Sequence, residues 1–236
     1  MTDQTAYRAA AQRGPHVKIC GLSDEAMIDV ALSRGASDVG FIHFARSPRH
    51  LSLEEMARLT AHVGERALVS VVTVDADDRL IGQIVERVRP HIIQLHGAET
   101  PERVEEIAVR TGLKTTKAFS VADAADLEKI ARYVPVAHRI LLDAKAPKGA
   151  ALPGGNGVSF DWSLLSALPA GLDYMLSGGL SAENVGEAVR RLRPWGLDVS
   201  SGVESAPGVK DAGRIHQFFD ALDAASLDPA SERRAP

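Results

Sequence analysis

The sequence predicts a single (βα)8 barrel, an α/β fold in which eight parallel strands each lead into a helix. Short runs rich in apolar and β-branched residues alternate strictly with longer segments of helical pattern, which favours a parallel sheet with helical crossovers. The chain has 236 residues, which suits one closed barrel of about 250 residues. An open, doubly wound sheet is the alternative. Against it, VKICGLSD stands where such a fold would carry GxGxxG after its first strand.

The expected elements follow one another along the chain with short connections. Strands are expected at 17–20, 38–42, 67–74, 91–95, 113–119, 138–143, 172–176 and 196–199. Helices are expected at 24–34, 53–62, 77–88, 101–111, 122–132, 161–167, 181–192 and 210–223. Residues typical of helix N-caps stand at the start of four helices, namely Ser23, Ser52, Asp77 and Ser181.

One catalytic barrel domain is expected over residues 17–223. Residues 1–16 are polar and lack the apolar core of a signal peptide, so they are interpreted as an N-terminal arm. Residues 224–236 are small, polar and proline-bearing, and a disordered C-terminal tail is expected there. The irregular segment 144–158 contains a glycine cluster at 153–157, which is either a lid over a ligand or an ordinary turn.

Composition argues against several classes of function. The formal net charge is −4, so the chain lacks the basic footprint of a nucleic-acid-binding protein. No apolar stretch approaches the roughly 20 residues that span a bilayer, so no membrane partner is expected. The single cysteine allows no intrachain disulfide. It fits a reducing compartment, and a cytoplasmic location is expected.

The end of the first predicted strand carries a lysine and the cysteine on one face. Side chains alternate along a strand, so Lys18 and Cys20 share a face while the apolar Val17 and Ile19 share the other. Barrel active sites lie where strands lead into the following loops. A cation beside a thiol lowers its pKa, so Lys18 is expected to make Cys20 a better base. The alternative is a small core residue beside an interior ion pair.

Two further strand ends carry polar side chains. Asp143 closes the sixth predicted strand. A carboxyl group in a partly dry barrel mouth can keep its proton and act as a general acid, and a helix cap or salt bridge is the alternative. His96 follows the fourth strand, where a polar core residue, a site residue and a metal ligand all remain open.

The last two predicted strands lead into loops rich in glycine and serine. They read LSGGLSAENV at 176–185 and DVSSGVE at 198–204. Glycine lets the backbone approach an anion closely, and consecutive N–H groups and helix N-termini bind phosphate. Because barrels often bind phosphate at these two positions, a small phosphorylated molecule is the expected ligand. Arg49, after the second strand, either clamps a carboxylate or is an ordinary surface charge.

Six ordered motifs resemble those of the phosphoribosylanthranilate isomerase family. They are KICGLSD (18–24), GFIHFARSPRHLS (40–52), QLHG (94–97), LLDAKAPKGAALPGGNGVSFDW (141–162), LSGGLSAENV (176–185) and DVSSGVESAPGVKD (198–211), and the resemblance runs from about residue 17 to 220. It implies an isomerase of tryptophan biosynthesis. Such an enzyme converts N-(5-phosphoribosyl)anthranilate into 1-(o-carboxyphenylamino)-1-deoxyribulose 5-phosphate by an Amadori rearrangement. No cofactor and no metal are implied, and a monomer or homodimer is expected.

The resemblance also implies roles for individual residues. Cys20 corresponds to the family's general base and Asp143 to its general acid, and Arg49 resembles the residue that orients the anthranilate end of the substrate. Substrate-binding residues are expected at Lys18, Arg49, His96 and Asp198, and phosphate-binding residues at Gly178, Gly179, Ser200, Ser201 and Gly202. Many members have a hydroxyl residue where this chain has Asn156, and the loop at 144–153 is longer than in compact members.

Three other functions stand as alternatives. A metal-dependent sugar-phosphate epimerase on the same fold would draw ligands from His43, His96 and Asp143. A phosphate-binding barrel without catalysis would serve as a ligand sensor or scaffold, because a fold does not determine a function. A related isomerase of histidine biosynthesis performs the same rearrangement with two aspartates. The cysteine at the end of the first strand argues against that reading.

Overall fold

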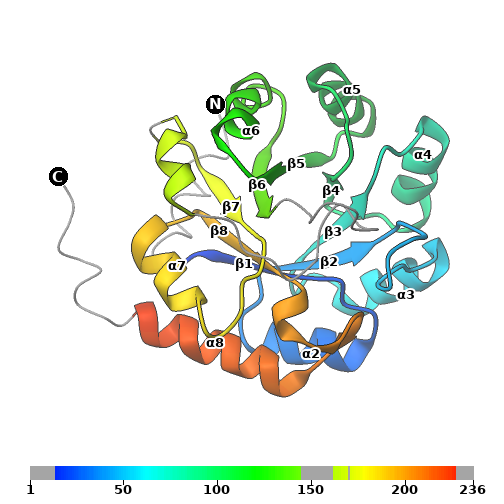
Figure 1. Ribbon diagram of the computed structural model, residues 1–236. Coiled ribbons are helices and arrows are strands. Elements are labelled where there is room, and N and C mark those ends of the chain that lie inside the picture. Colours follow the sequence, from blue (N-terminus) through cyan, green and yellow to red (C-terminus); the bar gives the residue numbers. More distant parts are fainter. Residues whose placement is uncertain (1–13, 145–161, 170, 227–236) are drawn as a thin grey trace.

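Eight parallel strands close into a barrel with the helices around its outside (Figure 1). This is a computed structural model, and it describes residues 14–144, 162–169 and 171–226. Each strand pairs with its neighbours in sequence. Strand β1 closes the barrel by pairing with β8, in a register that sets Lys18 opposite Asp198. The predicted fold class is confirmed.

The strands lie close to their predicted positions. They are β1 (His16–Cys20), β2 (Asp38–Ile42), β3 (Leu68–Thr73), β4 (Ile92–Leu95), β5 (Lys114–Val121), β6 (Arg139–Ala144), β7 (Tyr174–Leu176) and β8 (Gly196–Val199). A small antiparallel hairpin that the sequence did not predict follows β8, and its strands are β9 (Glu204–Ala206) and β10 (Val209–Lys210). The hairpin extends the chain past the barrel mouth before the last helix begins.

The helices lie close to their predicted positions, and two of them differ from the prediction in type. They are α2 (Glu25–Ser33), α3 (Leu53–Val63), α4 (Asp78–Arg87), α5 (Pro101–Thr111), α6 (Ala124–Glu128), η2 (Lys129–Arg132), η3 (Trp162–Ala167), α7 (Val185–Leu192), η4 (Ser201–Val203) and α8 (Ala212–Ser226). The helix predicted at 122–132 divides into α6 and the 3-10 helix η2. There the N–H of Tyr133 donates to the carbonyl of Ile130 at 2.8 Å, a bond that tightens a helix end. The helix predicted at 161–167 is the 3-10 helix η3.

Two predicted N-caps, Ser52 and Asp77, are confirmed, and two, Ser23 and Ser181, are wrong. At α2 the carboxylate of Asp24 accepts from the N–H of Met27 at 2.9 Å, so the cap lies one residue later than predicted. Helix α7 begins only at Val185 and its N-cap position is Asn184, so Ser181 lies in the preceding turn.

The barrel has an apolar outer layer and a polar interior. Strand side chains that face the helices, such as Ile19 and Phe41, are fully buried in a continuous core. The inner face carries buried charges instead. Asp38 accepts hydrogen bonds from Ser70 Oγ at 2.9 Å and from Arg139 at 3.1 Å. Since Asp38 and Arg139 each open their strand, this ion pair closes the base of the barrel.

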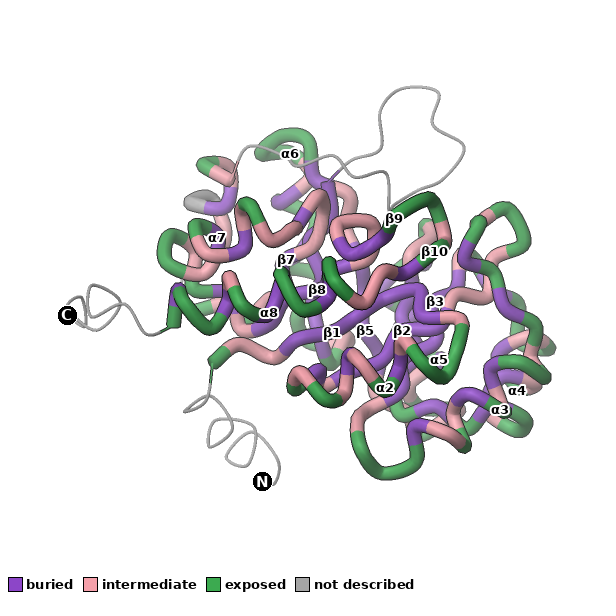
Figure 2. Tube along the Cα trace, turned by 90° about the horizontal axis from the view of Figure 1, so that it is seen from below, coloured by how far each residue is buried: buried purple, intermediate pink, exposed green. Residues whose placement is uncertain are grey.

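The barrel strands are mostly buried, whereas the outer faces of the helices are exposed (Figure 2). Helix α8 ends at Ser226 instead of 223, because Ala225 is buried and lies against Gly186 of α7. The rest of the expected tail, residues 1–13 of the expected arm, and 145–158 with the glycine cluster and Asn156 lie outside the described residues. Within the described ranges, no helix is both long enough and apolar enough to cross a membrane.

Candidate active site

A solvent-open pocket of about 590 Å³ lies where the strands lead into their following loops. It is lined by Cys20, Ile42, Phe44, Ser47, Arg49, Val72, Val74, Gln94, His96, Asp143, Ser177, Asp198 and Ser200. The structure thus brings together the predicted base, the predicted acid and four other predicted site residues. The remaining predicted residues, Lys18, Gly178, Gly179, Ser201 and Gly202, do not line this pocket.

Lys18 lies one layer below Cys20 on the inner face of β1, as strand alternation predicted. Its side chain is fully buried, and its Nζ donates to Asp198 Oδ1 at 2.9 Å. Burial lowers the pKa of Lys18, but the charges of Asp198 and Cys20 outweigh this and raise the pKa above its usual value. The lysine is therefore a permanent cation beneath the pocket.

Lys18 lowers the pKa of the Cys20 thiol, as expected, but this effect does not set the net direction of the shift. Burial raises the pKa of Cys20, Lys18 lowers it, and Asp198 raises it again, so that the pKa lies above its usual value. Because Cys20 is only 6% exposed, lost hydration outweighs one cation whose charge Asp198 already compensates. The folded chain therefore favours the thiol over the thiolate at neutral pH.

A glycine that sequence reasoning missed makes room for this pair. Gly40 of β2 lies beside Cys20 in the sheet. A Cβ at Gly40 would lie 2.9 Å from Cε of Lys18 and 3.0 Å from Sγ of Cys20. Strand glycines often mark such a close approach, and a glycine in the middle of the predicted strand at 38–42 was the available signal.

Asp143 faces His96 across the pocket wall. The two side chains come from β6 and the loop after β4, and Nε2 of His96 lies 3.5 Å from Oδ2 of Asp143. The other carboxylate oxygen, Oδ1, accepts from the N–H of Ala144 at 2.9 Å. Among the described residues, His96 Nε2 is buried without a hydrogen-bond partner. Asp143 is thus fixed by its own backbone on one side and has a ring nitrogen close by on the other.

The two glycine-rich loops pack against each other beside the pocket. Gly178 and Gly179 have φ angles of +87° and +65°, where glycine is favoured. At Gly202, a Cβ would lie only 1.8 Å from the carbonyl oxygen of Leu180 in the other loop. Ser200 lines the pocket and the short helix η4 follows it, an arrangement common at barrel phosphate sites. This corner suits a phosphate group.

At the ends of β2 and β3 the pocket is apolar, in contrast to the polar corner at β7 and β8. There the pocket is lined by Ile42, Phe44, Val72 and Val74. Such an apolar wall can cover an aromatic ring, while the polar corner at β7 and β8 can bind an anion. The pocket therefore distinguishes two ends of a ligand.

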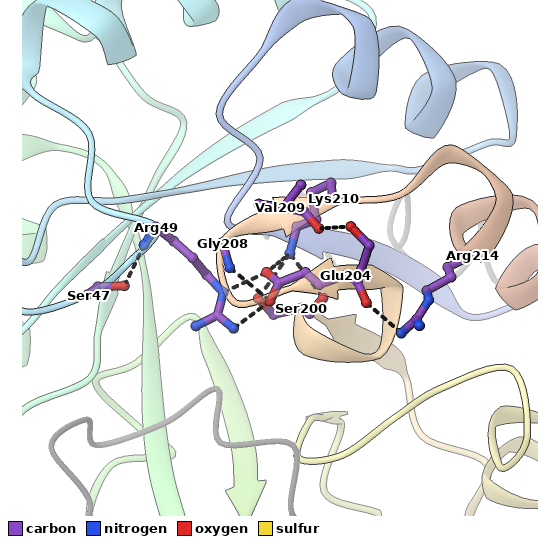
Figure 3. Close-up of polar contacts among 9 residues, drawn as sticks. Ser47, Arg49, Ser200, Glu204, Gly208, Val209, Lys210 and Arg214 are labelled. Atoms are coloured by element: carbon purple, nitrogen blue, oxygen red, sulfur yellow. Dashed lines mark hydrogen bonds and ion pairs between the residues drawn. The ribbon is translucent and has the colours of Figure 1, made fainter.

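Arg49 lines the pocket, and two of its side-chain nitrogens donate hydrogen bonds to Glu204, which does not line it (Figure 3). Its Nε and Nη2 donate to Oε1 and Oε2 of Glu204, each at 2.7 Å. Lys210 Nζ also donates to Glu204, at 2.7 Å. Burial raises the pKa of Glu204, but the hydrogen bonds from Arg49 and the charge of Lys210 outweigh it, and the pKa lies below its usual value. Glu204 and Lys210 were not singled out from the sequence.

The alternative metal site does not form. His43 Nδ1 lies 2.8 Å from the carbonyl oxygen of Leu51, and the centroid of its ring lies 4.9 Å from that of the tilted His50 ring. Across the described part of the chain, no three His, Cys, Asp or Glu side chains are grouped so that they could hold a metal ion. His43, His96 and Asp143 therefore do not converge as an epimerase would require.

Comparison with known proteins identifies relatives over nearly the whole chain. The family model described as N-(5′-phosphoribosyl)anthranilate (PRA) isomerase matches residues 17–221. The N-(5′-phosphoribosyl)anthranilate isomerase of Mesorhizobium japonicum is 52% identical over 215 residues, which cover 91% of this chain and 98% of that protein. That of Brucella canis is 52% identical over 217 residues, which cover 92% of this chain and 98% of the relative.

Solved structures agree. The crystal structure of phosphoribosyl anthranilate isomerase from Thermotoga maritima matches this chain with a TM-score of 0.78 and 33% identity. The match covers 89% of this chain and 99% of the Thermotoga chain. A second isomerase, solved in complex with reduced 1-(o-carboxyphenylamino)-1-deoxyribulose 5-phosphate, has a TM-score of 0.76 and 31% identity with the same coverage. This chain therefore belongs to the N-(5′-phosphoribosyl)anthranilate isomerase family, as its six ordered motifs predicted.

Proposed function

We propose that this chain rearranges N-(5′-phosphoribosyl)anthranilate to 1-(o-carboxyphenylamino)-1-deoxyribulose 5-phosphate by general acid–base catalysis, with Cys20 as base and Asp143 as acid. The isomerase activity, in tryptophan biosynthesis, follows from membership of the family. One observation carries the assignment of residues. Cys20 and Asp143 lie at the ends of β1 and β6, and both line the same pocket.

The first step opens the furanose ring. Asp143, in its protonated form, donates a proton to the ring oxygen as the bond between C1′ and that oxygen breaks. The lone pair of the anthranilate nitrogen forms the C1′–N double bond, and an iminium ion results. His96 Nε2 and the N–H of Ala144 flank the two oxygens of Asp143. These contacts keep the carboxyl group oriented towards one position in the pocket.

The second step removes the proton from C2′. Cys20 takes this proton as thiolate, and the electrons of the C–H bond form an enamine, which tautomerises to the ketone. The thiol pKa lies above its usual value in the free chain. An iminium ion beside the thiol adds a positive charge that favours the thiolate. Together with Lys18, which lowers the thiol pKa, this charge makes Cys20 a base when the base is required.

The two ends of the pocket orient the substrate. The phosphate is placed at the corner formed by Ser177, Ser200 and the glycine-rich loops of β7 and β8. The aromatic ring is placed along the apolar wall of β2 and β3, and Arg49, which lines the same pocket, is proposed to bind the anthranilate carboxylate. This orientation sets the ribose between Cys20 and Asp143. Holding the reacting carbon between acid and base supplies much of the rate through positioning.

The chemistry needs only proton transfers, so we propose that no cofactor takes part. The partner is the phosphorylated small-molecule substrate, and no nucleic acid or membrane is proposed. A solved relative is described as monomers generated from the dimeric isomerase of Thermotoga maritima, and a monomer or homodimer is proposed here. We place the chemistry in the barrel domain expected at 17–223, whose first strand begins at His16 and whose last helix ends at Ser226, and the enzyme in the cytoplasm.

The activity is tested directly by substrate fluorescence. Purified protein is mixed with N-(5′-phosphoribosyl)anthranilate, and the loss of the anthranilate emission is followed while the product is identified chromatographically. We expect rapid conversion that is unaffected by EDTA. A folded protein that binds a phosphorylated sugar yet converts none of this substrate would support the ligand-sensor alternative and overturn the proposal.

A further inference from the structure

The carboxylate of Glu204 connects two residues that line the pocket, although Glu204 itself does not line it (Figure 3). It lies on β9 and is 5% exposed. We propose that Glu204 is a positioning residue that fixes Arg49 directly and Ser200 through Lys210, and so couples the two anion-binding ends of the site. The inference rests on the proposed function, which assigns those ends to the carboxylate and the phosphate of one substrate.

The connection to Arg49 is a two-point fork. Nε and Nη2 donate to the two oxygens of Glu204, each at 2.7 Å, and both side chains are buried. A bidentate pair fixes the plane of the guanidinium as well as its position. On another side the arginine packs over Gly21, where a Cβ would lie 2.6 Å from Cδ of Arg49. A ligand therefore meets a guanidinium whose orientation is already set.

The connection to the phosphate corner runs through Lys210. Its Nζ donates to Oε1 of Glu204 at 2.7 Å, to the carbonyl oxygen of Ser200 at 3.0 Å, and to Ser200 Oγ at 3.2 Å. These contacts use all three protons of an ammonium group. Because Ser200 lines the pocket, Lys210 transmits the position of Glu204 to the corner assigned to phosphate.

Glu204 is the shared counter-ion that keeps the two cations of this group in place. Arg49, Glu204 and Lys210 together carry one net positive charge. A neutral residue in place of Glu204 would leave two buried cations close together without their shared counter-ion, which is strongly unfavourable. One or both cations would move apart, and the two ends of the site would lose their relative placement.

The hairpin that carries Glu204 is itself fixed to the arginine loop. Gly208, in the hairpin turn, has a φ of +84°, and its N–H donates to Oε2 of Glu204 at 3.2 Å. A Cβ at Gly208 would lie 2.6 Å from the carbonyl oxygen of Pro48, one residue before Arg49. From α8, Arg214 donates to the carbonyl oxygen of Glu204. These contacts hold the hairpin, and with it the Glu204 side chain, in a fixed position against the Arg49 loop.

The test uses two small probes, anthranilate for the Arg49 end and inorganic phosphate for the Ser200 end, each measured as a competitive inhibitor. We expect Arg49→Met to raise the inhibition constant of anthranilate alone and Lys210→Met to raise that of phosphate alone, each by about tenfold. Glu204→Gln is expected to raise both constants. It should also lower kcat/KM by about 10²-fold, mainly through KM.

A double-mutant cycle shows whether Glu204 acts through Arg49. In an Arg49→Met background, Glu204→Gln is expected to leave the anthranilate constant within about twofold, because no guanidinium remains to be positioned. An equal loss in both backgrounds would overturn the proposal, as would a Glu204→Gln variant that changes neither constant or only one. If Glu204→Gln does not fold, Glu204→Asp keeps the charge on a shorter side chain and is expected to raise both constants.

A matched control separates positioning from general destabilisation. Asp38→Asn also removes a carboxylate from a buried arginine, Arg139, but at the base of the barrel. It is expected to lower the thermal midpoint while both inhibition constants stay unchanged. Turnover by the unsubstituted chain is measured first. Absence of turnover there would reject the proposed function, whereas an active wild type with unaltered Glu204 variants would reject only this inference.

Discussion

Lys18 and Asp198 form a buried ion pair of 2.9 Å directly beneath the thiol of Cys20. The two charges act on the thiol in opposite directions, since Lys18 lowers its pKa and Asp198 raises it. The pair therefore sets the ionisation of the proposed base as well as the packing of the barrel interior.

Removing either charge should move the thiol pKa in a defined direction. Lys18→Met is expected to raise the pKa of Cys20, and Asp198→Asn is expected to lower it. The thiolate is the form that reacts with iodoacetamide, so the pH at which alkylation becomes rapid rises in the first variant and falls in the second. The chain has one cysteine, so mass spectrometry reports this site alone. Unshifted alkylation profiles in both variants would contradict the assignment.

A methyl group at Gly40 should disturb the base directly. In Gly40→Ala the new carbon would lie 2.9 Å from Lys18 and 3.0 Å from the thiol sulfur, which displaces both. We expect kcat/KM to fall by about 10²-fold. Gly82→Ala is the matched control, because Gly82 lies exposed in α4 with nothing within 4 Å of a Cβ. It should keep full activity and gain roughly 0.5–1 kcal/mol of stability, measured by urea unfolding.

The phosphate corner should fail when its two loops are forced apart. Gly202→Ala places a carbon 1.8 Å from the backbone carbonyl of Leu180, and backbone cannot move aside as a side chain can. Competitive inhibition by inorganic phosphate is expected to weaken by about tenfold or more, with a lower thermal midpoint. Unchanged phosphate inhibition in a folded Gly202→Ala protein would place the phosphate elsewhere.

The N-terminus of α2 gives a test of stability that is independent of the site. Asp24→Ala removes the carboxylate that accepts from the N–H of Met27, and is expected to cost about 1 kcal/mol of unfolding free energy. Ser23→Ala, at the residue favoured by the sequence pattern, is expected to cost almost nothing. Urea denaturation of both variants decides between the two caps, and a larger loss at Ser23 would show that the cap is misassigned.

The fold and the catalytic pair could be predicted because their signals are local. Alternation of apolar runs with helical segments needs only neighbouring residues, and Cys20 and Asp143 are recognisable as polar groups at strand ends. Parallel strands in a closed barrel then bring such ends together whatever their separation in sequence. The six motifs, in the same order as in the family, indicated the family to which the chain belongs.

The rest depended on contacts between distant segments. The direction of the thiol pKa is set by burial and by Asp198, which reaches β1 only when the barrel closes. The orientation of Arg49 is fixed by Glu204. This residue lies in a hairpin whose two strands are too short to show an alternation of polar and apolar residues. Gly40 matters because Lys18 and Cys20 of the neighbouring strand lie close to it, and the sequence of β2 alone does not show that contact.

The measurement that tests the central assignment most directly is kcat for Cys20→Ser and Asp143→Asn, two changes that nearly preserve size. A hydroxyl is a far weaker base than a thiolate, and an amide cannot donate a carboxylic proton. We expect each variant to lose roughly 10²–10⁴-fold in kcat while its thermal midpoint stays close to that of the wild type. Near-native turnover in either variant would contradict the role given to that residue.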